Sequence, residues 1–169
     1  MIPADRQRNY LQSALYVLIA AILATILLNR LFTAAEYAER AAMQVSVSNL
    51  QTSLYARLAL LVLKGDVAAI PELETRSPFI TAQMASSATY AGEFPGTAPQ
   101  TVGDGTWYFD TLRNELVYRV RYASHFITDG ERGEKSEIRF RVHVVRATSG
   151  AYRGVELRPV APFQWDPGA

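Results

Sequence analysis

A run without charge, from Asn9 to Asn29, constrains the fold more than any other feature of this sequence. The stretch Leu11–Leu28 consists almost wholly of Leu, Ile, Val and Ala. A helix rises about 1.5 Å per residue, so about 20 such residues cross the roughly 30 Å hydrocarbon core of a bilayer. We therefore predict a transmembrane helix over residues 9–30. Its anchoring side chains include Leu11, Leu15, Leu18, Ile22 and Ile26.

Two other interpretations of this run remain open. A buried core helix rarely runs so far without a charge, and a cleaved signal peptide has a shorter apolar run of about 7–15 residues. Arg6 and Arg8 precede the run, whereas Arg30 follows it. Because positive charge is retained on the cytoplasmic side, we expect residues 1–8 to form a cytoplasmic tail. The C-terminal domain would then lie in the periplasm. The helix would contact the lipid of a bacterial inner membrane and anchor the protein there.

The helix is predicted to continue past the membrane, because neither Pro nor Gly occurs between Pro3 and Gly65. Along residues 31–64 apolar side chains recur at steps of three and four, which is the period of one helical face. Gly65 follows Lys64 as a C-cap signal, so the helix should run from near Asn9 to Lys64. This face should cover the chain's own sheet or, alternatively, pack on a partner helix in a coiled coil. Its members are Met43, Val47, Leu50, Leu54, Leu58 and Leu61.

Residues 65–105 are predicted to form a connection without long regular elements. This segment is rich in Pro, Gly, Ser, Thr and Ala, and proline interrupts both helices and strands. A short helical turn is expected over Val67–Leu73. The rest should be an ordered loop.

Alternation of apolar and polar residues predicts a sheet in residues 106–169. The expected strands are Thr106–Asp110, Glu115–Phe126, Glu137–Ala147 and Tyr152–Val160. They would form a three- to four-stranded antiparallel meander with one apolar face. Because the helix and the sheet each have one apolar face to bury, the predicted fold class is α+β, with the long helix packed on the sheet.

Four short blocks resemble, in order and spacing, a pattern of type IV pilins and type II secretion pseudopilins. They are Ser77 to Phe79, Tyr90 to Glu93, Gly105 to Asp110, and Glu115 to Val120. Pilin-like proteins of mannose-sensitive haemagglutinin (MSHA) pilus biogenesis clusters are the nearest in pattern. The resemblance implies a pilin-like roll. The positions that match the motif are Pro78, Tyr90, Gly92, Glu93, Trp107, Tyr108, Asp110, Leu116 and Tyr118.

The chain departs from this family at its anchor. Processed members carry a Gly at the cleavage site and a Glu shortly after it, whereas here no Gly precedes Gly65 and no Glu lies in Asn9–Asn29. We therefore expect no cleavage by a prepilin peptidase and no place as a major subunit of the fibre. The resemblance then implies an accessory protein of the inner membrane that contacts pilins, pseudopilins or assembly-platform proteins.

No constellation typical of an active site occurs in the sequence, so we expect no enzyme, no cofactor and no metal. Absence of Cys excludes disulfides and thiolate chemistry, and a net charge of +1 gives no reason to expect nucleic acid as a partner. His125 and His143 are expected on the surface. A calcium loop at Asp129 and Glu131 would lack a full series of ligands.

Arginine side chains of two adjacent strands should share one outward face. They are either balanced by glutamates on a solvated surface or form a docking patch for an acidic partner. The aromatic residues of the same strands are expected in the core, with a binding platform as the alternative. The arginines of the candidate patch are Arg119, Arg121, Arg139 and Arg141.

Together these patterns predict a non-enzymatic, pilin-like assembly component of a type IV pilus or a type II secretion apparatus. The alternative is an unrelated single-pass inner-membrane platform or sensor protein with a periplasmic interaction module. An anchored periplasmic enzyme is a third hypothesis, which no residue cluster supports.

Overall fold

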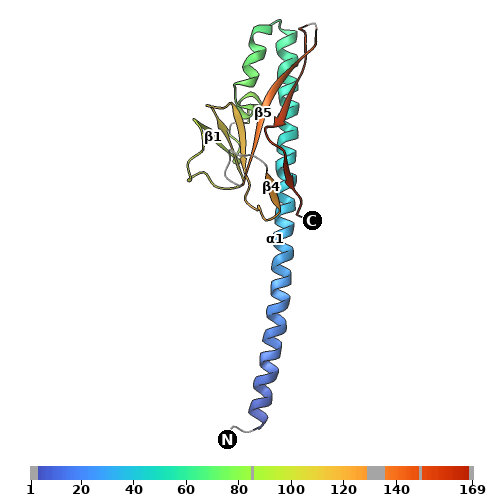
Figure 1. Ribbon diagram of the computed structural model, residues 1–169, viewed down its shortest axis with the longest axis vertical. Helices are drawn as coiled ribbons and strands as arrows, with labels where there is room; N and C mark the ends of the chain where they lie inside the picture. The colour runs from blue at the N-terminus through green and yellow to red at the C-terminus, as the bar shows by residue number, and fades with distance from the viewer. Residues whose placement is uncertain (1–3, 85, 129–135, 149, 168–169) are drawn as a thin grey trace.

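The structure is a computed structural model that describes residues 4–84, 86–128, 136–148 and 150–167, with side chains from Gln12 onward. One long helix dominates it (Figure 1). An α+β domain packs along the C-terminal half of this helix, while the N-terminal half projects alone. The fold class is therefore α+β, with a long N-terminal helix, as the sequence predicts.

The elements follow in chain order. The helices are α1 (Ala4–Leu63), the 3-10 helix η1 (Val67–Glu74) and the short α2 (Pro78–Thr81). The strands are β1 (Tyr90–Phe94), β2 (Thr106–Asp110), β3 (Glu115–Arg119), β4 (Phe126–Thr128), β5 (Glu137–Arg146), β6 (Tyr152–Pro159) and β7 (Phe163–Trp165).

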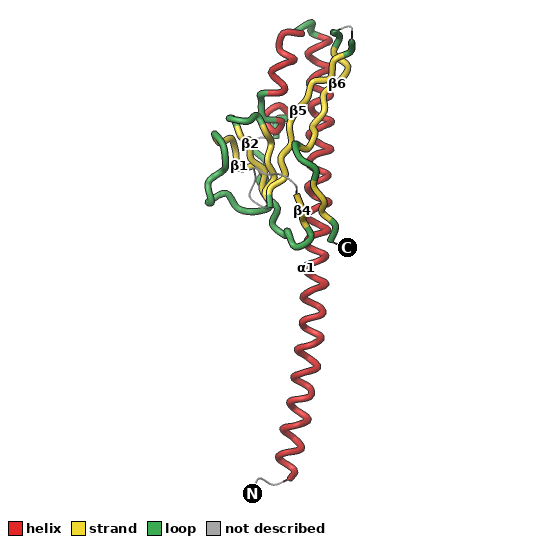
Figure 2. Tube along the Cα trace, viewed as in Figure 1, coloured by secondary structure: helices red, strands yellow, loops and turns green. Residues whose placement is uncertain are grey.

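The long helix ends at a glycine in the left-handed region. Gly65 has φ +72°, and its N–H donates to Val62 O at 3.0 Å. The N–H of Asp66 donates to Leu61 O at 3.0 Å. These two bonds make a Schellman motif, which satisfies carbonyls that the helix end would leave open. The chain then reverses, and η1 runs back beside α1 (Figure 2).

The main sheet has five strands in the order β1-β2-β3-β5-β6. Three of its pairings are antiparallel, but β1 and β2 are parallel. The expectation of an all-antiparallel sheet of three to four strands is therefore wrong: the sheet is mixed. Residues 65–105 contain η1, α2 and β1, not only a connection. Strand β1 gave no sequence signal because Ala91 and Gly92 have low strand propensity.

The strand predicted over Glu115–Phe126 is wrong beyond Arg119. There the chain leaves the ladder, because the carboxylate of Glu39 on α1 accepts the backbone N–H groups of Arg121 and Tyr122 at 2.7 and 2.8 Å. The chain returns to extended structure in β4, which pairs antiparallel with β7. This two-stranded sheet lies beside α1 at the end of the domain nearest the projecting helix (Figure 1).

The core lies between α1 and the main sheet. It joins the inner face of α1 to β2, β3, β5 and β6 and to the buried Ile70, Leu73 and Phe79 of η1 and α2. A second, small cluster lies on the other face of the sheet, where Ala98 and Val102 cover Tyr108 and Val117. The sheet is thus covered on both faces, rather than apolar on one face only. This explains why every residue of β3 is buried.

Candidate functional site

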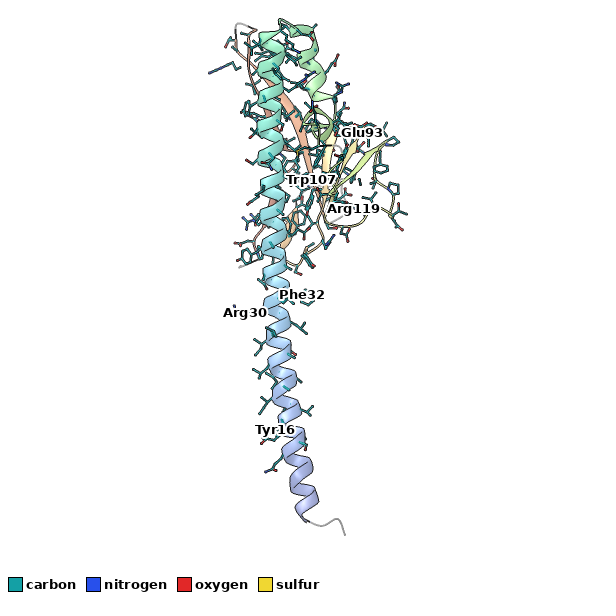
Figure 3. All side chains as sticks on the ribbon, turned by 180° about the vertical axis from the view of Figure 1, so that it is seen from behind. Tyr16, Arg30, Phe32, Glu93, Trp107 and Arg119 are labelled. Atoms are coloured by element: carbon teal, nitrogen blue, oxygen red, sulfur yellow. The ribbon has the colours of Figure 1, made fainter. Side chains whose placement is uncertain are left out.

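The first half of α1 has no protein around it. Among the described residues, α1 is the one helix that is long and apolar enough to cross a membrane, and none of its most apolar window is buried. Thr25 donates its hydroxyl to Ala21 O at 2.9 Å, so its polar group is satisfied within the helix. Figure 3 shows Tyr16 and Phe32 extending freely from this half.

The predicted anchoring residues are all on this free half. Leu15, Leu18, Ile22 and Ile26 are exposed by half or more of their surface. Leu11 belongs to α1, but its side chain lies outside the described side chains. This half of α1 is long and apolar enough to be a single membrane span.

The second half of α1 buries the predicted packing face. Val47 is half-buried in the core, and the other members are buried in it: Met43, Leu50, Leu54, Leu58 and Leu61. Because the chain's own sheet covers this face, it is not free to form a coiled coil. The opposite side of the same half remains open and exposes Val45, Leu60 and Leu63. Tyr37, Tyr55 and Val62 are exposed as well, but Tyr55 lies at the flank beside Gly154 of β6.

Glu36 is the most buried acidic side chain of α1, with 2% of its surface exposed. It lies where the projecting helix enters the domain. Its Oε1 accepts the indole N–H of Trp165 at 2.9 Å and the backbone N–H of His125 at 3.0 Å. Its Oε2 lies 2.8 Å from Nδ1 of His125. One carboxylate thus joins α1 to both the β4 and the β7 segments.

Glu39 repeats this role one turn further along α1. Its Oε1 accepts the hydroxyl of Tyr118 at 2.8 Å, in addition to the backbone N–H of Arg121. We call Glu36 and Glu39 together the carboxylate clamp. Each carboxylate accepts several hydrogen bonds from the domain, and for the buried Glu36 this is the condition under which a buried charge stabilises a fold.

The pKa values of Glu36 and of Tyr118, the partner of Glu39, are shifted in opposite directions. Burial alone would raise the pKa of Glu36, but the hydrogen bonds from His125 and Trp165 outweigh burial and hold its pKa below the ordinary value of 4.5. Burial and the adjacent Glu39 carboxylate raise the pKa of Tyr118. Glu36 is therefore ionised and Tyr118 protonated at neutral pH.

Sequence reasoning missed the clamp. His125 is exposed, as expected, but its Nδ1 lies 2.8 Å from Oε2 of Glu36, which is 89 positions away in the chain. The only sequence signal was two glutamates just beyond an apolar run, which flanking charge also explains. His143 is exposed on β5. The calcium loop considered at Asp129 and Glu131 lies outside the described residues.

Pro78, Tyr90 and Trp107 of the motif lie where α2 meets the sheet, whereas Tyr108 lies in the cluster on the other face. Tyr90 stacks on Phe79 with ring centroids 4.5 Å apart, and its hydroxyl shares a hydrogen bond of 2.9 Å with the buried Ser77. Trp107 packs against Phe79, Tyr118 and Phe140. Pro78, Tyr108 and Leu116 are buried as well, and Gly92 has φ +111°. These positions are explained by packing and backbone geometry.

The motif contains two acidic residues, Asp110 and Glu93, which differ in their burial. Asp110 is fully buried, and its Oδ1 accepts the backbone N–H groups of Gly96, Leu112 and Arg113 at 3.0, 3.0 and 3.2 Å. It therefore fixes both the turn after β2 and the loop after β1. Glu93 is exposed on the edge strand β1, away from the helix (Figure 3).

The four arginines of the candidate patch each have partners. Arg139 pairs with Glu137 at 2.8 Å, with Glu115 at 3.3 Å and with Asp110 at 3.5 Å. Arg141 pairs with Glu115 at 2.6 Å. These contacts favour the interpretation of arginines balanced by carboxylates.

The other two arginines hold the loop that covers this face. Arg119 donates to Val102 O at 2.6 Å, and Arg121 donates to Asp104 O at 2.8 Å. The loop therefore covers part of this face, while Arg121 and Arg141 remain exposed. Tyr108 belongs to the polar network of this face through a 3.1 Å hydrogen bond to Glu137, and burial together with this carboxylate raises the pKa of Tyr108 to about 12.

The part of the chain that the structure describes contains no group of three or more His, Cys, Asp or Glu side chains that could hold a metal ion. Its polar clusters are instead hydrogen-bonded networks that hold the domain on the helix. Comparisons with protein-family models, curated proteins and solved structures found no significant match to this chain.

Proposed function

We propose that this protein is a non-enzymatic, pilin-like accessory component of a type IV pilus or a type II secretion apparatus. The observation that carries the proposal is the division of one helix into two halves. The first half is apolar and bare, and the second half packs on a mixed sheet. This is the arrangement that the motif blocks around Pro78, Trp107 and Leu116 imply.

The membrane topology follows from charge. Arg6 and Arg8 lie before the apolar run and stay in the cytoplasm, so the domain lies in the periplasm of a bacterium with an inner membrane. The clamp then lies close to the membrane surface: Glu36 is six residues beyond Arg30, which is about 9 Å along a helix. It makes the membrane anchor and the domain one mechanical unit.

The open side of α1 supplies the lateral contact. Val45 and Leu63 lie on the side of α1 opposite the buried packing face and are exposed. Exposed apolar side chains of this kind are candidates for an interaction site. It would pack against helices of pilins, pseudopilins or a platform protein.

The anchor favours an accessory role over a place in the fibre shaft. The run Asn9–Asn29 contains no carboxylate to neutralise the amino terminus of a neighbouring subunit. Extraction of the protein would draw Asp5, Arg6 and Arg8 through lipid, which costs several kcal/mol. The protein therefore stays in the membrane while true pilins leave it.

The test is the intact mass of the protein from native membranes and from sheared surface fibres. An uncleaved, unmethylated chain confined to the membrane is the expected result. A trimmed, N-methylated chain in the fibres would make the protein a minor pilin instead.

Cross-linking distinguishes the second candidate function. The chain has no Cys, so Val45→Cys introduces a single reporter on the open side of α1, and Arg153→Cys on β6 is the control. Cross-links from position 45 to a pilin or pseudopilin are expected. If position 45 cross-links only to a second copy, in cells that lack pilins as well, the protein is a platform or sensor unrelated to pilins.

A further inference from the structure

An open cavity of about 180 Å³ lies between the last turns of α1 and the connection formed by η1 and α2. The last turns of α1 and η1, which contribute to its lining, lie at the end of the domain farthest from the projecting half of α1 (Figure 1). None of the predicted site residues except Leu61 lines it. The side chains that matter for binding are Arg57, Leu61, Glu72, Arg76, Ile80 and Gln83.

The floor of the cavity is apolar. Leu61 and Leu73 are each 4% exposed and belong to the core, so the floor is rigid. Ile80 stands at the wall and is 39% exposed. An apolar group that enters the cavity would contact Leu61 and Ile80, and its surface would be removed from water.

The rim of the cavity is cationic. Arg57 and Arg76 line it from two different elements and are exposed. Within the described residues, neither guanidinium has an ion pair or a side-chain hydrogen bond, in contrast to Arg119, Arg139 and Arg141. Glu72 is the one carboxylate among the lining residues, so the rim carries a net positive charge.

Gln83, which lines this cavity, has a backbone conformation that is strained for a residue with a side chain. It has φ +59°, and it is the left-handed residue that ends α2: its N–H donates to Ile80 O at 3.0 Å, and the N–H of Met84 donates to Phe79 O at 2.8 Å. Gly is the usual residue at this position of a Schellman motif. Backbone strain of this kind clusters at functional sites, and here it accompanies a carboxamide at the cavity.

We propose that this cavity binds an acidic side chain of a partner protein together with an adjacent apolar residue. The guanidinium groups of Arg57 and Arg76 would receive the carboxylate, since their planar forks match its geometry. The apolar neighbour would lie on Leu61 and Ile80. This proposal goes beyond the function proposed above, because it holds for any partner that presents such a pair.

The size and the position of the cavity restrict the ligand. A cavity of about 150 Å³ takes up a molecule the size of benzene, whereas sites for whole cofactors or drug-sized ligands measure about 300–1,000 Å³. Arg57 is 27 residues beyond Arg30, or about 40 Å along the helix, which is out of reach of lipid headgroups. Of the remaining sources, an acidic residue of a partner protein is the one that also supplies an adjacent apolar group.

The test uses the full chain in detergent micelles with methyl-labelled Leu and Ile. The probes are the blocked peptides acetyl-Gly-Leu-Glu-Gly-amide and acetyl-Gly-Leu-Gln-Gly-amide. The Glu peptide should shift the Leu61 and Ile80 methyl signals in a saturable way, and the Gln peptide should bind about tenfold more weakly, because it forms no charge-assisted hydrogen bond.

Arg57→Gln and Arg76→Gln should each weaken the Glu peptide severalfold, whereas Arg153→Gln, which lies outside the cavity on β6, should leave its binding unchanged. Equal binding of the two peptides, or no shift at these methyl groups, would overturn the proposal. Displacement of the peptide by an equal concentration of inorganic phosphate would also overturn it, because the site would then be a simple anion site.

Discussion

The indole N–H of Trp165 donates to Oε1 of Glu36 at 2.9 Å, across 129 positions of the chain. This bond connects β7 to α1 seven residues beyond the end of the uncharged run Asn9–Asn29. With the bonds of His125 to the same carboxylate, it holds the domain on α1 at the end opposite the turn at Gly65.

Replacement of Glu36 should loosen this end of the domain. Glu36→Ala leaves the buried indole N–H of Trp165 and the backbone N–H of His125 without an acceptor, so we expect the free energy of unfolding to fall by about 1–3 kcal/mol. Urea unfolding followed by tryptophan fluorescence measures this. Glu93→Ala is the matched control, because Glu93 is exposed, and it should change stability by less than about 0.5 kcal/mol. Equal effects of the two substitutions would show that the clamp contributes nothing.

Acid should destabilise the domain through two carboxyl groups. The pKa of Asp110 is held below its ordinary value of 3.8, because its bonds with Arg113, Leu112 and Gly96 outweigh the burial that would raise it, and the pKa of Glu36 is held below 4.5 in the same way. The unfolded chain therefore binds protons more tightly. The resulting stability is fully present above the ordinary values and is lost as the pH falls through the lower folded-state values.

We expect the free energy of unfolding to decline from about pH 5 downward. Urea titrations over this range test the decline. Glu36→Gln and Asp110→Asn should each flatten it, and Glu93→Gln should not. A slope that survives in the double variant Glu36→Gln/Asp110→Asn would mean that other groups cause the acid sensitivity.

The long helix, its apolar first half and the packing face of its second half could be predicted from the sequence, because they depend on local composition and periodicity. The steps of three and four that end at Leu61 define one face whatever packs on it, and Gly65 can end a helix without tertiary help. The strands β2 and β5 are similar, since their alternation reflects burial on the two faces of a sheet.

The clamp and the parallel strand could not be predicted, because they depend on contacts distant in the chain. Glu39 ends β3 because it accepts the backbone N–H groups of Arg121 and Tyr122. The sequence near Arg119 contains no signal for these bonds. The loop that covers Tyr108 and Val117 hides a second apolar face, so alternation alone assigned Arg119 and Arg139 to solvent. Arg119 pairs with Glu137 and Arg139 pairs with Asp110. These pairs can be recognised only once the register of the strands is known.

Gln51 closes an open edge of the sheet. Its Nε2 donates to Val155 O at 2.6 Å, and its Oε1 accepts the N–H of Leu157 at 2.7 Å, so its carboxamide pairs with β6 as a neighbouring strand would. Gln51→Ala should lower the free energy of unfolding by about 1–3 kcal/mol, because both backbone groups lose their partner. The exposed edge should also promote association at high concentration.

Gln44 provides the control for this prediction. It lies on the same helix seven residues earlier and is exposed. Gln44→Ala should leave both stability and association unchanged. Sedimentation velocity in detergent, together with urea unfolding, compares the two variants; a monomeric Gln51→Ala protein of normal stability would contradict the role of Gln51.

Gln83→Gly should stabilise the protein. The left-handed conformation at φ +59° strains any side chain, and Gly removes this strain at the end of α2, so we expect a gain of about 0.5–1 kcal/mol in the free energy of unfolding. Gly65→Ala, at φ +72° in the equivalent motif that ends α1, should have the opposite sign. Thermal unfolding of the two variants in parallel measures both effects, and a destabilised Gln83→Gly variant would contradict the prediction.

Arg139 provides the positive charge at the centre of the ion-pair network on the covered face of the sheet. Its guanidinium contacts three carboxylates, those of Asp110, Glu115 and Glu137, and all three are buried. Arg139→Leu would leave them without their central counter-charge. Because removal of one partner from a buried ion pair costs about 3–5 kcal/mol, we expect this variant to be among the least stable single substitutions.

The triple variant Arg139→Leu, Asp110→Asn and Glu115→Gln should recover much of that loss, since it removes two of the uncompensated carboxylates, while Glu137 keeps Arg119 as a counter-charge. Arg153→Leu, on the exposed surface of β6, is the control and should change stability by less than about 0.5 kcal/mol. Urea unfolding of the three variants decides the matter. If Arg139→Leu is as mild as Arg153→Leu, the carboxylates are held by their backbone and tyrosine donors alone, and the arginines of this face are free for another role.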